Sequence, residues 1–266
     1  MATILMSGAD FFNVSYEIND WMDADVQVDA ALARQQWQAL KRVLEEEVGA
    51  TVWTSPAQEG LPDMVFTANA AVVVGQKALL AHYRYPERQG EEAVMRDWFE
   101  DNGFEVLAPP HQRFFEGAGD ALRYGSFYLA GYHSRTEIET HNWLTVESGV
   151  PVLSLKLENP KFYHVDVTLC PTDLGDLIVY PKAYRREDWD LICSVVPESK
   201  RIIVPTEEAY DFACNVVSVG SHIVMGSPAP VLTAKLQARG YSVHHVEMSE
   251  FKKAGGSVKC CTLRLQ

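Results

Sequence analysis

The chain has 266 residues, of which 47% are hydrophobic, so it can bury a sizeable core, which excludes a disordered or low-complexity protein. Its net charge of −13 and the lack of any Lys/Arg run longer than two residues argue against a nucleic-acid partner. No apolar run approaches the roughly 18 residues of a membrane span, and the first residues do not resemble a secretory leader, so we expect a cytoplasmic protein with no membrane partner.

Five segments with helical periodicity are each followed by a short strand rich in β-branched residues. In four of them a glycine stands between helix and strand, as expected at a helix end that turns left-handed. The predicted helix and strand pairs are 30–48 with 50–54, 91–102 with 104–110, 136–148 with 150–156, 186 onward with 201–206, and 230–239 with 241–247.

After each strand comes a loop and then a hairpin with a glycine near its turn. The four complete hairpins read AVVVG-QKALLA, ALRYG-SFYLAG, TLCPTDLGDLIVYP and VVSVG-SHIVMG, whereas the fifth unit has only CTLRL, which the N-terminal strand TILMS can complete. A repeat of about 40–55 residues predicts a propeller or another radial array, closed by pairing of the chain ends, in one domain over 1–266. A doubly wound sheet is the alternative, but its G-x-G-x-x-G turn is absent.

The loop that opens each hairpin carries one polar residue, and these residues lie 45 to 51 positions apart. In a radial array, equivalent positions meet at one end of the axis, so the spacing predicts a single cluster. A thiol beside an imidazole and carboxylates is a nucleophile-plus-base arrangement. Singly, each residue has a plainer explanation, as core filler, a local hydrogen bond or a turn. The five residues are Asn69, Glu116, His164, Asn215 and Cys260.

The five cysteines are odd in number and include no C-x-x-C pair or zinc-like spacing. Free thiols in a reducing compartment fit this pattern best, with no metal site.

Four motifs in the same order along nearly the whole chain, F-T-A-N-A, F-E-G-A-G-D, H-V-D and G-G-S-V-K-C-C-T-L, resemble the guanidine-modifying superfamily. That superfamily includes arginine deiminases, dimethylarginine dimethylaminohydrolases, amidinotransferases and arginine or succinylarginine dihydrolases. The resemblance implies a five-bladed α/β propeller (pentein) of ββαβ-type units with pseudo-fivefold symmetry. It also implies a small-molecule substrate, L-arginine or a close derivative, attacked by a cysteine without metal or organic cofactor. The resemblance leaves open whether the protein forms a homo-oligomer.

By the same resemblance, Cys260 matches the nucleophile and His164 the general acid/base. Asp166 in H-x-D and Glu116 match carboxylates that meet the guanidinium, which suits a planar cation with a fixed fork of N–H donors. The motif E-G-A-G-D has one residue more than the family's E-G-G-D, which leaves the role of Asp120 open.

The other end of an arginine substrate needs different partners. Arg135 in S-R-T matches an arginine that contacts the substrate carboxylate, and Arg88 matches another; a surface charge at a helix N-terminus is the alternative for both. Asn19 resembles part of an N-terminal flap, and Asp63 is expected at the substrate amine. Asn215 has the right register, but a turn asparagine competes with any catalytic role.

Asn69 indicates which hydrolase this is. Deiminases commonly have F-T-R-D where this chain has F-T-A-N, and T-A-N-A resembles the dihydrolases. A neutral amide can hydrogen-bond a ureido group and hold a citrulline-like first product for a second attack. The sequence therefore predicts an arginine dihydrolase that yields ornithine, carbon dioxide and two ammonia. The alternatives are a deiminase or dimethylarginine dimethylaminohydrolase that stops at citrulline, an amidinotransferase, or a non-catalytic arginine-binding protein.

Overall fold

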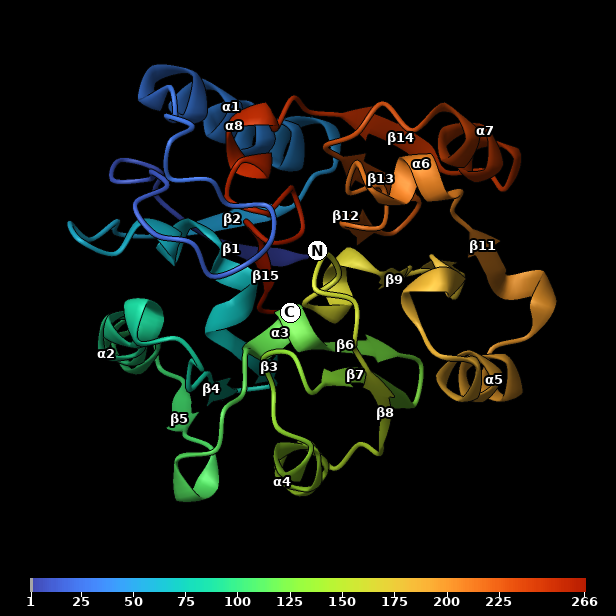
Figure 1. Cartoon of the computed structure of the whole chain (residues 1–266), viewed down its shortest axis with the longest axis horizontal. Coiled ribbons are helices and arrows are strands. Elements are labelled where there is room, and N and C mark those ends of the chain that lie inside the picture. Colours follow the sequence, from blue (N-terminus) through green and yellow to red (C-terminus); the bar gives the residue numbers. More distant parts are fainter. Residues whose placement is uncertain (1) are drawn as a thin grey trace.

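The computed structural model describes residues 2–266 and has five three-stranded sheets around a central axis (Figure 1). In each sheet an antiparallel pair is joined by a third, parallel strand. The strands, sheet by sheet, are β15 (Leu263–Arg264), β1 (Thr3–Ser7) and β2 (Thr51–Ser55); β3 (Ala71–Val74), β4 (Lys77–Leu80) and β5 (Glu105–Leu107); β6 (Ala121–Tyr124), β7 (Phe127–Tyr132) and β8 (Val152–Lys156); β9 (Leu169–Pro171), β10 (Leu177–Val179) and β11 (Arg201–Ile203); and β12 (Val216–Val219), β13 (His222–Met225) and β14 (Ser242–His245).

One long helix precedes the third strand of each sheet, and these helices form the outer ring in Figure 1. They are α1 (Ala30–Arg42), α2 (Pro86–Asp101), α4 (Glu139–Ser148), α5 (Arg186–Val195) and α7 (Pro230–Ala238). The order strand, strand, helix, strand within each unit confirms the five-bladed α/β propeller. Parallel strands require such a crossover, and α2, α4 and α7 each pack against the third strand of their own sheet.

Element boundaries differ from the sequence prediction where local chemistry intervenes. The predicted helix over 30–48 ends as an α-helix at Arg42 and continues as a π-helical turn (Val43–Glu47), closed by a bond from Val48 N to Val43 O. The helix predicted from 91 begins at Pro86, because proline is favoured in the first turn. The strand predicted over 104–110 is only β5, since two prolines follow it and cannot donate to a ladder.

The two ends of the chain complete one sheet, as the repeat predicts. β15 pairs antiparallel with β1, with Leu5 opposite Leu263, and Thr3 N donates to Gln266 O at 3.3 Å. Both ends therefore lie near the centre of the ring (Figure 1). Within residues 2–266, no helix has the length and apolar character that crossing a membrane requires.

Short helical turns connect the outer elements to the inner strands. They include α3 (Gly117–Asp120), α6 (Thr206–Ala209), α8 (Ser249–Lys252) and the 3₁₀ turns Pro62–Val65, Thr67–Ala70, Pro110–Gln112, Val165–Val167, Pro181–Ala183 and Glu198–Lys200. Several of these turns come directly before the first strand of a hairpin, so they face one end of the axis.

Closing the ring should account for a measurable part of the stability. Leu5 is completely buried in a cluster with Leu263 and Phe99, so Leu5→Ala should lower the free energy of unfolding by about 2–5 kcal/mol. Urea denaturation measures this. The control Val146→Ala, on the exposed face of α4, should change it by less than about 0.5 kcal/mol. Equal effects of both substitutions would contradict the packing described.

Candidate active site

The five polar residues at equivalent repeat positions lie together at one end of the axis. Asn69 Nδ2 lies 3.5 Å from His164 Nδ1, His164 Nε2 lies 2.7 Å from Glu116 Oε2, and Asn215 Nδ2 lies 3.1 Å from Cys260 Sγ. All five side chains are buried. Each stands just before an inner strand, so the repeat of the fold places them side by side.

Glycines allow the turns that carry these residues to approach closely. Gly117 has φ +57°, and a Cβ there would lie 2.6 Å from Asn69 O, so only glycine lets α3 pack on the Asn69 turn. A Cβ on Gly119 would lie 2.1 Å from Asn69 Nδ2. Asp120, whose role the sequence left open, accepts from Thr136 Oγ1 (2.7 Å) and from Val165 N (3.2 Å), and thereby joins neighbouring blades.

Glu116 is the buried charge that organises His164. Its Oε2 accepts from His164 Nε2 and from Arg135 Nη1 (3.2 Å), and its Oε1 accepts from Arg84 N (3.3 Å). Burial opposes its ionisation, but the Arg135 guanidinium and the His164 hydrogen bond outweigh burial and hold the pKa of Glu116 well below its usual range. Because the ionised carboxylate only accepts, Nε2 of His164 is the donor in this hydrogen bond, and Nδ1 faces Asn69.

The amide of Asn69 is held in one orientation. Its Oδ1 accepts from Arg88 Nη1 at 2.8 Å, so its Nδ2 donor faces His164. Arg88 is in turn fixed by Glu91, which accepts from Nε and Nη2 at 2.8 Å each. Sequence analysis missed Glu91; its i,i+3 spacing from Arg88 within a helix is the signal that could have identified it.

The Cys260 thiol is held by Asn215 and Asp166. Its Sγ donates to Asp166 Oδ2 (3.4 Å) and accepts from Asn215 Nδ2, while Asn215 Oδ1 accepts from the backbone N–H groups of Lys259 (3.0 Å) and Cys260 (3.3 Å). Burial, and then the charge of Asp166, raise the pKa of the thiol well above its ordinary value. Asn215 is thus more than a turn residue, and the sulfur has no hydrogen bond to His164 among the described residues.

Two buried carboxylates of the site each have an oxygen atom that accepts no hydrogen bond from the described residues. Asp166 Oδ1 and Asp63 Oδ1 are buried and have no hydrogen-bond partner within residues 2–266. Burial is the main reason that the pKa of each is raised. A buried carboxylate oxygen without a donor is costly, so a cation with several N–H groups would be well accommodated here.

Both arginines that the sequence singled out are buried, which excludes the alternative of a surface charge. Arg135 lies between the rings of Tyr85 (4.6 Å) and Tyr163 (4.7 Å), and its Nη2 donates to Ile18 O at 2.7 Å. Arg88 also donates to Asp63 O (3.0 Å), so its guanidinium is largely occupied by protein groups.

A narrow pocket reaches the thiol, with a cavity volume of about 10 Å³, which is room for about one water molecule. The half-buried Asn19 lines it and donates to Ala254 O (3.2 Å), which ties the N-terminal segment to the segment after α8. Glu116, His164 and Asp166 lie behind the pocket, in the hydrogen-bond network. No group of three or more potential metal ligands occurs within residues 2–266. Six of the predicted site residues line the pocket: Asn19, Asp63, Asn69, Arg88, Arg135 and Cys260.

Comparison with known proteins identifies a family and several relatives that match nearly the whole chain. The family model for "N,N dimethylarginine dimethylhydrolase, eukaryotic" matches residues 13–266. The bifunctional arginine dihydrolase/ornithine cyclodeaminase AgrE of Nostoc sp. is 40% identical over 98% of this chain, which spans only 37% of AgrE. The N(G),N(G)-dimethylarginine dimethylaminohydrolase of Mycobacterium tuberculosis is 36% identical over 98% of this chain and 84% of that protein. A substrate-bound mutant of the N-terminal domain of ArgZ, a cyanobacterial arginine dihydrolase, superposes with a TM-score of 0.97 at 39% identity, covering 100% of this chain and 98% of that one.

The buried charge of Glu116 should be essential to the stability of this region. Glu116→Gln leaves Arg135 without its anion, so we expect the free energy of unfolding at pH 7 to fall by about 3–5 kcal/mol in urea denaturation. The control Glu137→Gln, which removes a more exposed ion pair with Arg113, should cost about 0–1 kcal/mol.

The difference in the free energy of unfolding between the native protein and Glu116→Gln should decrease at low pH. Because the pKa of Glu116 is lowered in the folded state, its contribution is present above the ordinary carboxyl pKa of 4.5 and is lost as pH falls through the lowered value. The gap between the native protein and Glu116→Gln should therefore be constant from pH 7 to about pH 5 and shrink below that. A gap that widens with acidification would refute this assignment.

Proposed function

The chain belongs to the N,N-dimethylarginine dimethylhydrolase family, and we propose that its propeller is one catalytic domain. The activity that we propose is that of an arginine dihydrolase, which converts L-arginine into L-ornithine, carbon dioxide and two ammonia. The observation that carries this proposal is the Asn69 amide, fixed with its N–H donor toward His164 beside a buried thiol and two carboxylates with free oxygens. The similarity to AgrE and ArgZ supports the same activity.

Each part of arginine finds a partner among the groups that line the pocket or lie directly behind it, and binding requires the pocket to open beyond the volume it has here. The guanidinium lies against Asp166 Oδ1, next to Cys260 Sγ, and the α-ammonium against Asp63 Oδ1. The positive charges of Arg135 and Arg88 favour the α-carboxylate, although hydrogen bonds to protein groups hold both guanidinium groups in place. Asn19 then covers the bound substrate from the N-terminal segment.

The bound cation helps to ionise the thiol, whose pKa burial otherwise raises. The side-chain N–H of Asn215 stabilises the thiolate of Cys260, and this thiolate forms a C–S bond to the guanidinium carbon. The proton that the thiol gives up is taken by Nδ1 of His164, which delivers it to the departing nitrogen as the C–N bond breaks and ammonia is released. Nδ1 of His164 then takes a proton from the water that attacks the thiouronium carbon. The C–S bond breaks and this proton passes to the sulfur, so that citrulline and the thiol are formed.

A second round completes the reaction. Cys260 attacks the ureido carbon, a second ammonia leaves, and water hydrolyses the remaining thioester-like bond to a carbamate, which separates into ornithine and carbon dioxide. Citrulline is neutral, so it cannot be retained by carboxylates alone. The Nδ2 donor of Asn69 suits the ureido oxygen, because Arg88 already occupies Oδ1.

Product analysis tests this proposal. With L-arginine, we expect ornithine and about two ammonia per arginine, measured by amino-acid chromatography and an ammonia assay, since each round of attack releases one. Cys260→Ala should abolish turnover, whereas Cys193→Ala, a thiol outside the site, should retain it. Stoichiometric citrulline with one ammonia would establish a deiminase instead, and dimethylamine from dimethylarginine would establish the activity named for the Mycobacterium relative.

The role of Asn69 can be tested separately. Asn69→Asp replaces the amide donor by a carboxylate, which only accepts hydrogen bonds. The carboxylate can pair with the guanidinium of arginine, but it repels the ureido oxygen of citrulline. We expect arginine to be consumed while the ratio of ornithine to citrulline falls at least about tenfold, a loss of about 1.4 kcal/mol in the second step. The exposed Asn102→Asp serves as the control. Two ammonia per arginine from Asn69→Asp would remove Asn69 from this role.

A further inference from the structure

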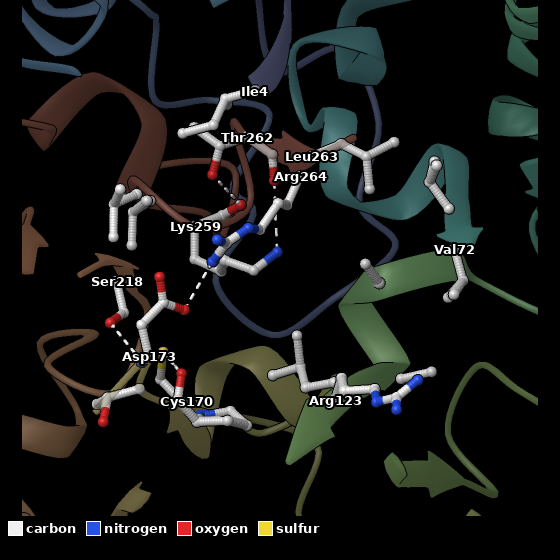
Figure 2. A pocket seen from close by; sticks show the side chains of 18 of the residues that line it. Ile4, Val72, Arg123, Cys170, Asp173, Ser218, Lys259, Thr262, Leu263 and Arg264 are labelled. Carbon is white, nitrogen blue, oxygen red and sulfur yellow. Dashed lines mark hydrogen bonds and ion pairs between the residues drawn. The ribbon is translucent and has the colours of Figure 1, made fainter. Parts of the chain in front are cut away.

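A second, larger pocket of about 480 Å³ runs along the inner strands. It begins beside the turn that carries Cys260, where Lys259 lines it, and extends toward the hairpin turns, where Arg123 of β6 and Ser218 of β12 line it. Figure 2 shows this pocket, with side chains contributed by segments from several blades. Its size is in the range of pockets that hold small organic molecules.

The charged side chains of this pocket are not balanced. Arg264 Nη1 donates to Asp173 Oδ1 at 2.7 Å, a pair visible in Figure 2. Within the described residues, Lys259 Nζ donates one hydrogen bond, to the backbone oxygen of Thr262 (3.4 Å). Arg123 Nε donates to the backbone oxygen of Gly125 (2.9 Å), and its guanidinium lies 5.8 Å from the centre of the Tyr128 ring. Neither cation forms an ion pair within residues 2–266. In a chain with a net charge of −13, the pocket is therefore a local concentration of positive charge.

The rest of the lining is largely apolar. Buried side chains from several blades form it, including Ile4, Val72, Leu122 and Val217. An apolar wall with a few convergent charged groups is the usual composition of a small-molecule site. The complementary ligand has an apolar body and a negatively charged head group.

We propose that this pocket is a second binding site, for a small organic anion whose oxyanion head pairs with the Lys259 ammonium and whose apolar body contacts the inner strands. Lys259 is half-buried, so an ion pair there is less screened than one on the open surface. Arg123, at the exposed rim, adds to the attraction.

The pocket is joined to the nucleophile through one turn. Lys259 and Cys260 are consecutive, and the backbone N–H groups of both donate to Asn215 Oδ1. Burial and Asp166 raise the pKa of the Cys260 thiol, whereas the charge of Lys259 acts in the opposite direction. An anion paired with Lys259 cancels that charge, so it makes the thiol harder to ionise. This effect on turnover rests on the proposed role of Cys260, but binding itself does not.

Binding is tested with naphthalene-1-sulfonate as the probe, in calorimetric titrations of the full chain. We expect one site on the native protein and a dissociation constant at least about tenfold higher for Lys259→Met. Arg123→Gln should weaken binding severalfold and serves as an independent variant should Lys259→Met fold poorly. The matched control is Lys235→Met, which removes an ammonium that also donates only to a backbone oxygen, that of Ile203, outside the pocket. Its affinity should equal that of the native protein.

Two further measurements complete the test. Naphthalene-1-methanol, a neutral compound of similar shape, should bind at least tenfold more weakly, and L-ornithine should not displace the sulfonate. The probe should also slow alkylation of Cys260 by iodoacetamide, located by mass spectrometry, in the native protein but not in Lys259→Met. Unchanged affinity in both pocket variants, equal binding of the neutral compound, or displacement by ornithine would each overturn the proposed site. None of these readouts requires turnover, so a failure of the proposed hydrolysis is seen separately.

Discussion

The pairing of β15 with β1 is the constraint on which the candidate site depends. It closes the ring and brings the turn that carries Cys260 against the turn before β3, where Ala68 N donates to Cys260 O at 3.0 Å. Only in the closed ring does the same turn also meet Asn215 and Asp166, which come from other blades. The position of the thiol is therefore a property of the whole architecture rather than of its local sequence.

Within this frame, the protein buries more charge than a folded core usually accepts. Glu116 is compensated by Arg135 and His164, and Arg88 by Glu91, so these groups act as a preorganised scaffold. Asp63 and Asp166 are not fully compensated. Asp166 contacts the thiol and Asp63 lines the same pocket, so a substrate with a cationic group at each end would contribute the missing hydrogen bonds.

The repeat made much of this predictable. Helix, glycine and strand recur with hairpins at regular spacing, and this was enough to give the five blades and to expect the opening loops to meet. The sequence could not show which partners each side chain takes. The sulfur contacts Asp166 and Asn215 rather than His164, and Arg88 is bound by Glu91, because such choices depend on distances of a few ångströms between distant segments. The π-helical turn at Val43–Glu47 likewise has no signature in the hydrophobic pattern.

The blade formed by β15, β1 and β2 lacks the covalent hairpin turn that the other four have, and the backbones of Thr3 and Gln266 are joined by a hydrogen bond. In topological terms the ring has no first blade. Joining these two residues through a short linker and opening the chain at the exposed turn of Gly220 would move the gap into the β12–β13 hairpin and preserve the pairing of strands in every sheet. The architecture is thus compatible with circular permutation, and the point at which the chain opens is independent of where its chemistry lies.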